Sequence, residues 1–151
     1  MNLSNNSAGW WTIERLVALA LAFLLLRSAF AHLGNPYAFL STVYSYNLTG
    51  IEGGKWIAAT LPALELVLGT ALLTGWWKKA THFLAASLFA AFTVAQWLVL
   101  RQGLSISCGC FGSTESLVIG PATLSLSGGG TVAALLACLI AQPDSPAKET
   151  P

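Results

Sequence analysis

The stretch TIERLVALALAFLLLRSAFA, residues 12–31, decides the class of fold. A helix that crosses the hydrocarbon core of a bilayer needs about 20 mainly apolar residues, and this stretch has that length. Backbone groups inside lipid must hydrogen-bond to one another, so a spanning segment is either a helix or a strand of a closed barrel. The stretch lacks the regular alternation of a barrel strand. We therefore predict a membrane-spanning helix over residues 12–33.

Three further apolar stretches predict helices over about 56–76, 81–100 and 124–141. The last stretch is the weakest, because it contains three consecutive glycines, although glycine in membrane helices lets neighbours approach closely. Residues 29–31, Ala-Phe-Ala, have the pattern of a signal-peptidase site, but no positive excess precedes them, so we expect the first helix to be retained. The fold class predicted is all-α: a polytopic membrane protein built as a four-transmembrane-helix bundle.

The composition supports this class. The chain has 151 residues, of which 55% are hydrophobic and only 9% are charged. Soluble domains carry about 25% charged residues, and a domain this small buries only about two-thirds of its unfolded surface. Much of the surface must therefore contact membrane lipid. The net charge is +1 without a basic stripe, so we expect no nucleic-acid partner.

The positive charges predict an orientation for a single membrane domain over residues 12–141. Lys78 and Lys79 lie in a tight loop between two predicted helices, and cytoplasmic loops carry the excess of lysine and arginine. With four spans, residues 1–11 form a cytoplasmic N-terminal segment and residues 142–151 a disordered cytoplasmic tail. The loop 101–123 then lies on the outer face of the cell's inner membrane, which is the periplasmic face in a Gram-negative cell.

Two cysteines in this loop, in the motif Cys108-Gly109-Cys110, are the candidate catalytic residues. Cysteines so close together can pair only if the backbone bends and brings their Cα atoms within about 4.4–6.8 Å. Gly109 permits the bend. Strained, exposed disulfides exchange readily, which favours a redox-active pair. A structural bridge, a metal clip and two free thiols remain alternatives, but two thiolates alone rarely complete a metal site, so we expect no metal.

Two charged residues lie within the predicted helices. Arg27 lies near the outer end of the first helix and Glu65 near the middle of the second. A charge in lipid costs several kcal/mol, so we expect both side chains to face inward and to pair. They would form either a proton or substrate site beneath the cysteine loop, or a structural ion pair. His32 lies on the same side as the cysteines, where it would either favour a thiolate or serve as an interfacial polar residue.

Two features have structural interpretations beside the functional ones. The aromatic residues Tyr37, Phe39, Tyr44 and Tyr46 precede the second predicted helix, where they would either cover the cysteines as a flap or anchor the chain at the membrane surface. Cys138, deep in the last predicted helix, lies about 20 Å from the cysteine loop at 1.5 Å per residue. It is interpreted as a small packing residue.

A family resemblance enters at the cysteine loop. Arg101-Gln102-Gly103, followed by Ser107-Cys108-Gly109-Cys110-Phe111-Gly112, resembles the signature of the MauE family of DoxX-like four-helix membrane proteins. Arg27, the loop NPYAF at 35–39 and the helical stretch LPALELVLG at 61–69 look like the same pattern. The resemblance covers roughly residues 12–141. It adds Gly109, Phe111 and Gly112 to the candidate site residues.

The resemblance implies a role in making disulfides in partner proteins. In methylamine utilisation, the family is associated with maturation of the disulfide-rich small subunit of methylamine dehydrogenase. The architecture is also similar to vitamin K epoxide reductase and to bacterial disulfide-forming membrane proteins, which makes quinone a candidate cofactor. Those proteins carry Cys-x-x-Cys and often a second pair, whereas this chain has Cys-x-Cys, and His32 stands where family members carry a lysine.

The leading hypothesis is a thiol–disulfide oxidoreductase whose partner is a periplasmic thioredoxin-like or disulfide-containing protein. A partner thiolate attacks one sulfur of the Cys108–Cys110 disulfide, and the second cysteine resolves the mixed disulfide. Three alternatives stay open. They are a non-enzymatic membrane assembly factor, a DoxX-like quinone-binding oxidoreductase subunit and a metal site.

Overall fold

The computed structural model describes residues 4–104, 106, 108 and 118–141, with side chains from residue 9 onward. Its helices are α1 (Ser4–Gly34), α2 (Pro36–Ser45), α3 (Ile51–Thr74), α4 (Lys78–Arg101) and α5 (Pro121–Ile140). Four of them, α1, α3, α4 and α5, are long and apolar enough to cross a bilayer. The predicted all-α fold of a multi-pass membrane protein with four transmembrane helices is confirmed.

The helix ends differ from the predicted ones. α1 begins at Ser4, so most of the expected segment 1–11 is helical. α3 begins at Ile51 and α5 at Pro121, both earlier than predicted. Hydropathy locates the lipid-spanning part of a helix, whereas a helix continues into its polar flank until a cap or breaker ends it. Pro121 is such a signal, because proline is favoured in the first turn. The tail 142–151 lies outside the described residues.

The short helix α2 lies in the stretch that the hydropathy pattern left as a loop. Its start is fixed by Asn35, whose Oδ1 accepts a hydrogen bond from the Ala38 N–H at 3.1 Å. Pro36 follows as the first helical residue. A polar N-cap before a proline is a standard helix start. With ten residues α2 is too short to span a membrane, so hydropathy alone does not predict it.

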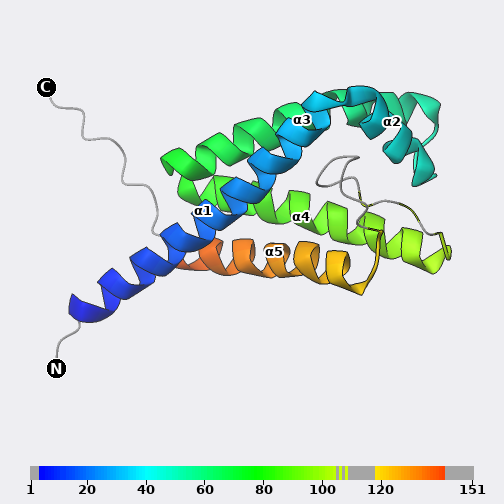
Figure 1. The fold of residues 1–151 in the computed structure, drawn as a ribbon. Helices are drawn as coiled ribbons and strands as arrows, with labels where there is room; N and C mark the ends of the chain where they lie inside the picture. Colours follow the sequence, from blue (N-terminus) through cyan, green and yellow to red (C-terminus); the bar gives the residue numbers. More distant parts are fainter. Residues whose placement is uncertain (1–3, 105, 107, 109–117, 142–151) are drawn as a thin grey trace, which may run out of the picture.

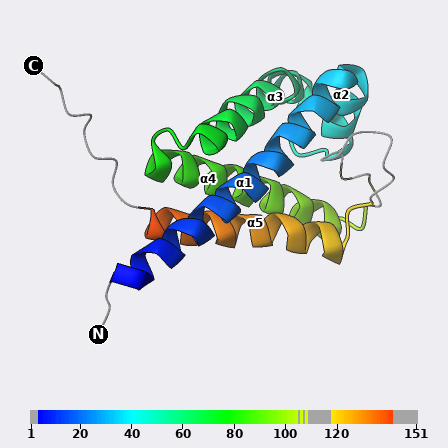
Figure 2. The ribbon, with the colours of Figure 1, turned by 60° about the vertical axis from the view of Figure 1, so that its left-hand side comes forward.

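The four long helices form two pairs, α1 with α3 and α4 with α5, that pack across a common core. Figures 1 and 2 both show α2, the end of α4 and the start of α5 at one end of the bundle, and the start of α1 at the other. We call the first the cysteine end, where Gly34, Ile51, Arg101 and Pro121 lie. The opposite end holds Thr74, Lys78 and Ile140.

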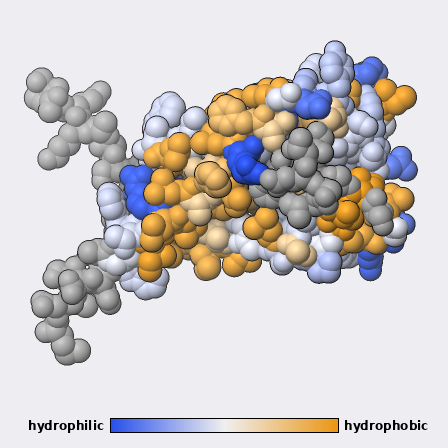
Figure 3. Space-filling model, viewed as in Figure 1, coloured by the Kyte–Doolittle hydropathy of each residue, from blue (hydrophilic) through white to orange (hydrophobic). Residues whose placement is uncertain are grey.

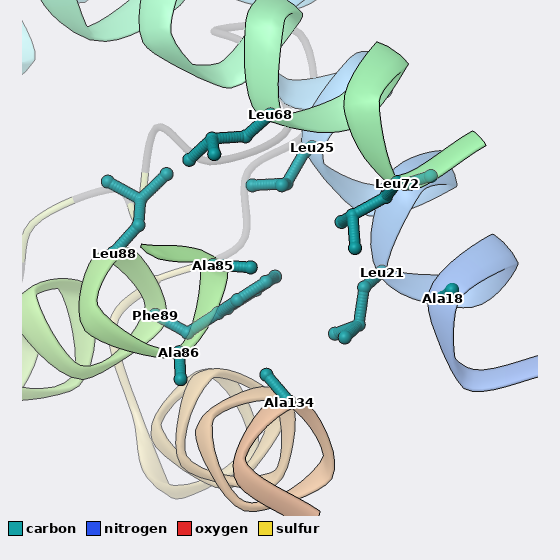
Figure 4. Packing of buried hydrophobic residues seen from close by; sticks show 11 residues of the cluster. Ala18, Leu21, Leu25, Leu68, Leu72, Ala85, Ala86, Leu88, Phe89 and Ala134 are labelled. Carbon is teal, nitrogen blue, oxygen red and sulfur yellow. The ribbon is translucent and has the colours of Figure 1, made fainter. Parts of the chain in front are cut away.

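Small residues allow the helices within the core to pack closely. Figure 4 shows side chains from all four long helices pointing into one space: Ala18, Leu21, Leu25, Leu68, Leu72, Ala85, Ala86, Leu88, Phe89 and Ala134. Gly130 of α5 lies against Phe89, because a Cβ added there would come within 2.9 Å of the Phe89 ring. Gly69 of α3 lies equally close to Leu26 of α1.

The outer surface is largely apolar. Figure 3 shows hydrophobic residues along the middle of one face and hydrophilic residues toward both ends. Phe23 is 66% exposed and Leu139 is 81% exposed. Soluble proteins rarely expose large apolar side chains in continuous patches. This surface suits contact with lipid.

Candidate functional site

Cys108 is the one residue of the cysteine motif that the structure describes. It lies at the cysteine end, is 5% exposed, and packs against Val99 of α4 and Ile119 ahead of α5. Gly109, Cys110, Phe111 and Gly112 lie outside the described residues, so their predicted roles stay predictions. The position of Cys108 is therefore what locates the candidate site in the bundle.

Two hydrogen bonds hold Cys108, and a third lies beside them. The Tyr46 hydroxyl donates to the Cys108 carbonyl oxygen at 3.0 Å, and the Gln96 Nε2 donates to the Cys108 Sγ at 3.6 Å. Beside them, the Ile119 N–H donates to the Ile106 carbonyl at 2.8 Å and joins the two stems of the loop. The sulfur is thus held in place with an amide donor aimed at it, an arrangement that stabilises negative charge on sulfur.

A small cavity lies between Cys108 and the helices. Its volume is about 40 Å³, and its polar lining comes from Ser28, Glu65, Gln96 and Cys108 on one side. Thr123 and Ser127 of α5 complete the lining among mainly apolar neighbours. A cavity of this size has room for one or two water molecules beside its few polar side chains. A carboxyl group and the cysteine sulfur therefore line the same small space in an apolar bundle.

Glu65 is completely buried, with 0% exposure. The Ser28 hydroxyl donates to Glu65 Oε1 at 3.0 Å. Glu65 Oε2 accepts no hydrogen bond within the part of the chain that the structure describes, and His32 Nε2 lies 3.7 Å from it. A buried carboxyl oxygen without a donor is costly.

The expected Arg27–Glu65 pair is replaced by a different contact. Arg27 is exposed rather than inward-facing, and its neighbour Ser28 is the α1 residue that touches Glu65. Successive residues of a helix point about 100° apart, so only one of the two can face α3. An arginine near a helix end can instead extend its charge to the interface.

His32 lies on the same face of α1, one turn beyond Ser28. It is 3% exposed, its Nε2 lies 3.1 Å from the Ser28 Oγ, and its ring stacks on Phe39 of α2 at a centroid distance of 3.7 Å. It therefore belongs to the buried site rather than to the exposed membrane interface. Its predicted effect on the thiolate stays a prediction.

A second, larger cavity of about 330 Å³ is also lined by Cys108. Its lining includes His32, Phe39, Tyr46 and Phe92 together with aliphatic side chains. Within the aromatic segment interpreted as a flap or an anchor, Phe39 and Tyr46 cover the site, whereas Tyr37 is 84% exposed. Cys108 thus lines both cavities.

Two residues of this site were not predicted from the sequence. Ser28 and Gln96 are single polar residues within apolar stretches, and nothing in hydropathy tells which face they occupy. One signal was present for Ser28, because it stands four residues before His32, and such residues share a helix face. Gln96 carried no comparable signal.

A separate polar cluster lies at the opposite end of the bundle. Glu14 of α1 is 3% exposed, and its Oε2 lies 3.3 Å from the Lys78 Nζ at the start of α4. His82 of α4 donates from Nδ1 to the Lys78 carbonyl at 2.7 Å. Cys138 lies at this end too, with its sulfur 3.5 Å from the Lys79 carbonyl oxygen.

No group of three His, Cys, Asp or Glu side chains that could hold a metal ion occurs among residues the structure describes.

A family model described as methylamine utilisation protein MauE matches residues 10–141. Neither the curated proteins nor the solved structures include a match to this chain.

Proposed function

The chain belongs to the MauE family, and from that premise we propose that it is a thiol–disulfide redox protein of the membrane. The observation that supports this most is the setting of Cys108. Its sulfur is buried, receives a hydrogen bond from Gln96, and borders a cavity that contains the carboxyl group of Glu65. A packing cysteine needs none of these polar neighbours.

The proposed reaction is an exchange between the Cys108–Cys110 disulfide and a partner protein. A partner thiolate attacks one sulfur, the Cys108–Cys110 bond breaks, and a mixed disulfide forms. A second partner thiolate then attacks the mixed disulfide. The partner leaves with a disulfide and this chain is left with two thiols, so two electrons have moved from the partner to this chain. The partner is a thioredoxin-like or disulfide-containing protein of the periplasm.

The location follows from charge. Lys78 and Lys79 at the start of α4 favour the cytoplasm for the opposite end of the bundle. The cysteine end then faces the periplasm, and both termini lie in the cytoplasm. Disulfides persist on the periplasmic side. The family's association with methylamine utilisation suggests where to search first for the partner.

A quinone-binding role is a second candidate, and the larger cavity favours it. A space of about 330 Å³ next to Cys108, with the flat rings of His32, Phe39 and Phe92 in its lining, suits a lipid-soluble ring. A quinone bound there would supply a two-electron acceptor. Filling the cavity by Ala95→Phe should then stop quinone-dependent reoxidation of the cysteines and leave exchange with small disulfides intact.

Thiol trapping in intact cells tests the proposal. In a Cys138→Ser background, a membrane-impermeant maleimide should label the Cys108–Cys110 pair only after reduction, which places an oxidised pair outside the membrane. Labelling without reduction would contradict a disulfide between Cys108 and Cys110. Labelling only after cell lysis contradicts the orientation. A Cys108→Ser, Cys110→Ser variant that still supports the partner's maturation would instead favour the assembly factor.

A further inference from the structure

We propose that Glu65, Ser28 and His32 form a proton relay that supplies the Cys108 sulfur, with Glu65 as the group that exchanges a proton with it. The inference rests on the proposed thiol–disulfide function and adds the route of the proton. Three buried polar residues, two on α1 and one on α3, carry it.

The need for a proton arises from burial. When Cys108 is the leaving group of a disulfide exchange, it departs as a thiolate. With 5% of the residue exposed, that charge has little access to bulk water. A buried ion without compensation is strongly disfavoured. The hydrogen bond from Gln96 lowers this cost but delivers no proton, because an amide does not ionise.

Glu65 is the carboxyl group placed to deliver one. It lines the same small cavity as Cys108, and its Oε2 accepts no hydrogen bond from any residue that the structure describes. A volume of about 40 Å³ has room for a water molecule. Such a water can bridge two polar groups that are too far apart for direct contact. The Oε2 of Glu65 is an acceptor to which this water can donate.

Ser28 extends the path away from the cysteine. Its Oγ lies 3.0 Å from Glu65 Oε1 and 3.1 Å from His32 Nε2. A hydroxyl can donate one hydrogen bond and accept another at the same time. His32 borders the larger cavity. The chain from Glu65 through Ser28 to His32 therefore connects the small cavity with the large one.

The proton step balances with the proton that the attacking thiol releases to water when it becomes a thiolate. The Cys108 thiolate takes a proton through the cavity water, so an S–H bond forms and the O–H bond of Glu65 breaks. The Ser28 hydroxyl then returns a proton to Glu65 and takes the Nε2 proton of His32. His32 gains the released proton at Nδ1 from water in the larger cavity, so its ring stays neutral. Two ionisable groups of the described structure lie near Glu65, His32 of α1 and Cys108 of the loop. The other polar groups around the cavity, Gln96 of α4 and Thr123 and Ser127 of α5, do not ionise.

Single-turnover reduction of the disulfide by dithiothreitol, followed as a function of pH in the Cys138→Ser protein, tests the relay. Glu65→Gln should slow reduction by roughly 100-fold and flatten its pH profile, as expected for loss of a general acid. Ser28→Ala should slow it in the same direction, and Ser28→Thr, which keeps the hydroxyl, should restore it. Glu52→Gln is the matched control, since Glu52 is an exposed acid on the same helix.

A second readout separates this inference from the proposed function. In a Cys110→Ser, Cys138→Ser protein, alkylation of Cys108 by a small reagent requires neither a disulfide nor a partner. Glu65→Gln should move the pH profile of alkylation to lower pH, because a neighbouring carboxylate no longer opposes the thiolate. Unchanged profiles in Glu65→Gln and Ser28→Ala would overturn the relay. A pair that never forms a disulfide would instead overturn the redox function, and alkylation would still decide on the relay.

Discussion

Gln96 acts on the sulfur of Cys108 through one amide hydrogen bond of 3.6 Å. Replacing it by leucine keeps the volume and removes the donor. One hydrogen bond contributes about 1 kcal/mol, which corresponds to roughly a fivefold change. We therefore expect Gln96→Leu to slow alkylation of Cys108 about fivefold at neutral pH, in a protein without the other cysteines. Gln102→Leu, at the exposed end of the same helix, should leave the rate unchanged.

Tyr46 acts on the backbone of Cys108 instead, through the 3.0 Å bond from its hydroxyl to the carbonyl oxygen. Loss of this bond in Tyr46→Phe should loosen the loop and increase labelling of Cys108 by a bulky thiol reagent several-fold. Tyr37→Phe removes the same hydroxyl from a side chain that is 84% exposed, so it serves as the control. Equal labelling of both variants would show that Tyr46 does not shield the cysteine.

The residues of the site were only partly predictable. Glu65 and His32 stood out because ionisable side chains within apolar stretches need a reason to be there. The partner of Glu65 could not be predicted, because Arg27 and Ser28 are adjacent in sequence and only packing decides which one faces α3. Charge suggested the arginine, whereas the structure uses the smaller hydroxyl, which fits between two close helices.

At the level of the helices, alanine substitutions at two adjacent glycines of α5 should change the stability in opposite ways. A Cβ at Gly130 would lie 2.9 Å from the Phe89 ring, whereas a Cβ at Gly129 would meet nothing within 4 Å. Gly130→Ala should therefore destabilise the α4–α5 pair by about 1–3 kcal/mol through overpacking. Gly129→Ala should be neutral or stabilising by up to about 1 kcal/mol, because alanine favours the helix. The free energy of unfolding in detergent distinguishes them.

The same distinction between pattern and packing governs the elements. The four long helices were predictable because lipid imposes a length and a hydropathy on every spanning segment. α2 was not predicted, although its start is encoded by Asn35 and Pro36, because an apolar stretch of ten residues is too short to be recognised as a spanning helix. Its position over His32 depends on the stacking of Phe39, which is a tertiary contact that sequence spacing does not reveal.

On the scale of the whole molecule, polar side chains of the two helix pairs come together at both ends of an apolar core. Glu65 and Ser28 of the α1–α3 pair line the small cavity together with Gln96 of α4 and Cys108 of the loop. At the opposite end, Glu14 of α1 meets Lys78 of α4. Between them the core is aliphatic and aromatic (Figure 4). The Glu14–Lys78 contact is therefore a direct polar link between the two pairs.

The Glu14–Lys78 pair gives the clearest test of this arrangement. Both side chains are largely buried, at 3% and 12% exposure, and the Lys78 Nζ also lies 4.3 Å from the centre of the Trp11 ring. Removing one member of a buried pair strands the other charge and costs about 3–5 kcal/mol. We expect Glu14→Ala to lower the free energy of unfolding in detergent by roughly that amount.

The control for this prediction is a second Glu–Lys pair in the same chain. Glu52 and Lys55 lie 2.8 Å apart but are 78% and 55% exposed. Solvent screens such a pair, so Glu52→Ala should cost less than about 1 kcal/mol although the measured distance is shorter. If the two substitutions cost the same, burial is not what makes the Glu14–Lys78 contact strong. In that case the α1–α3 and α4–α5 pairs are joined mainly by the apolar core.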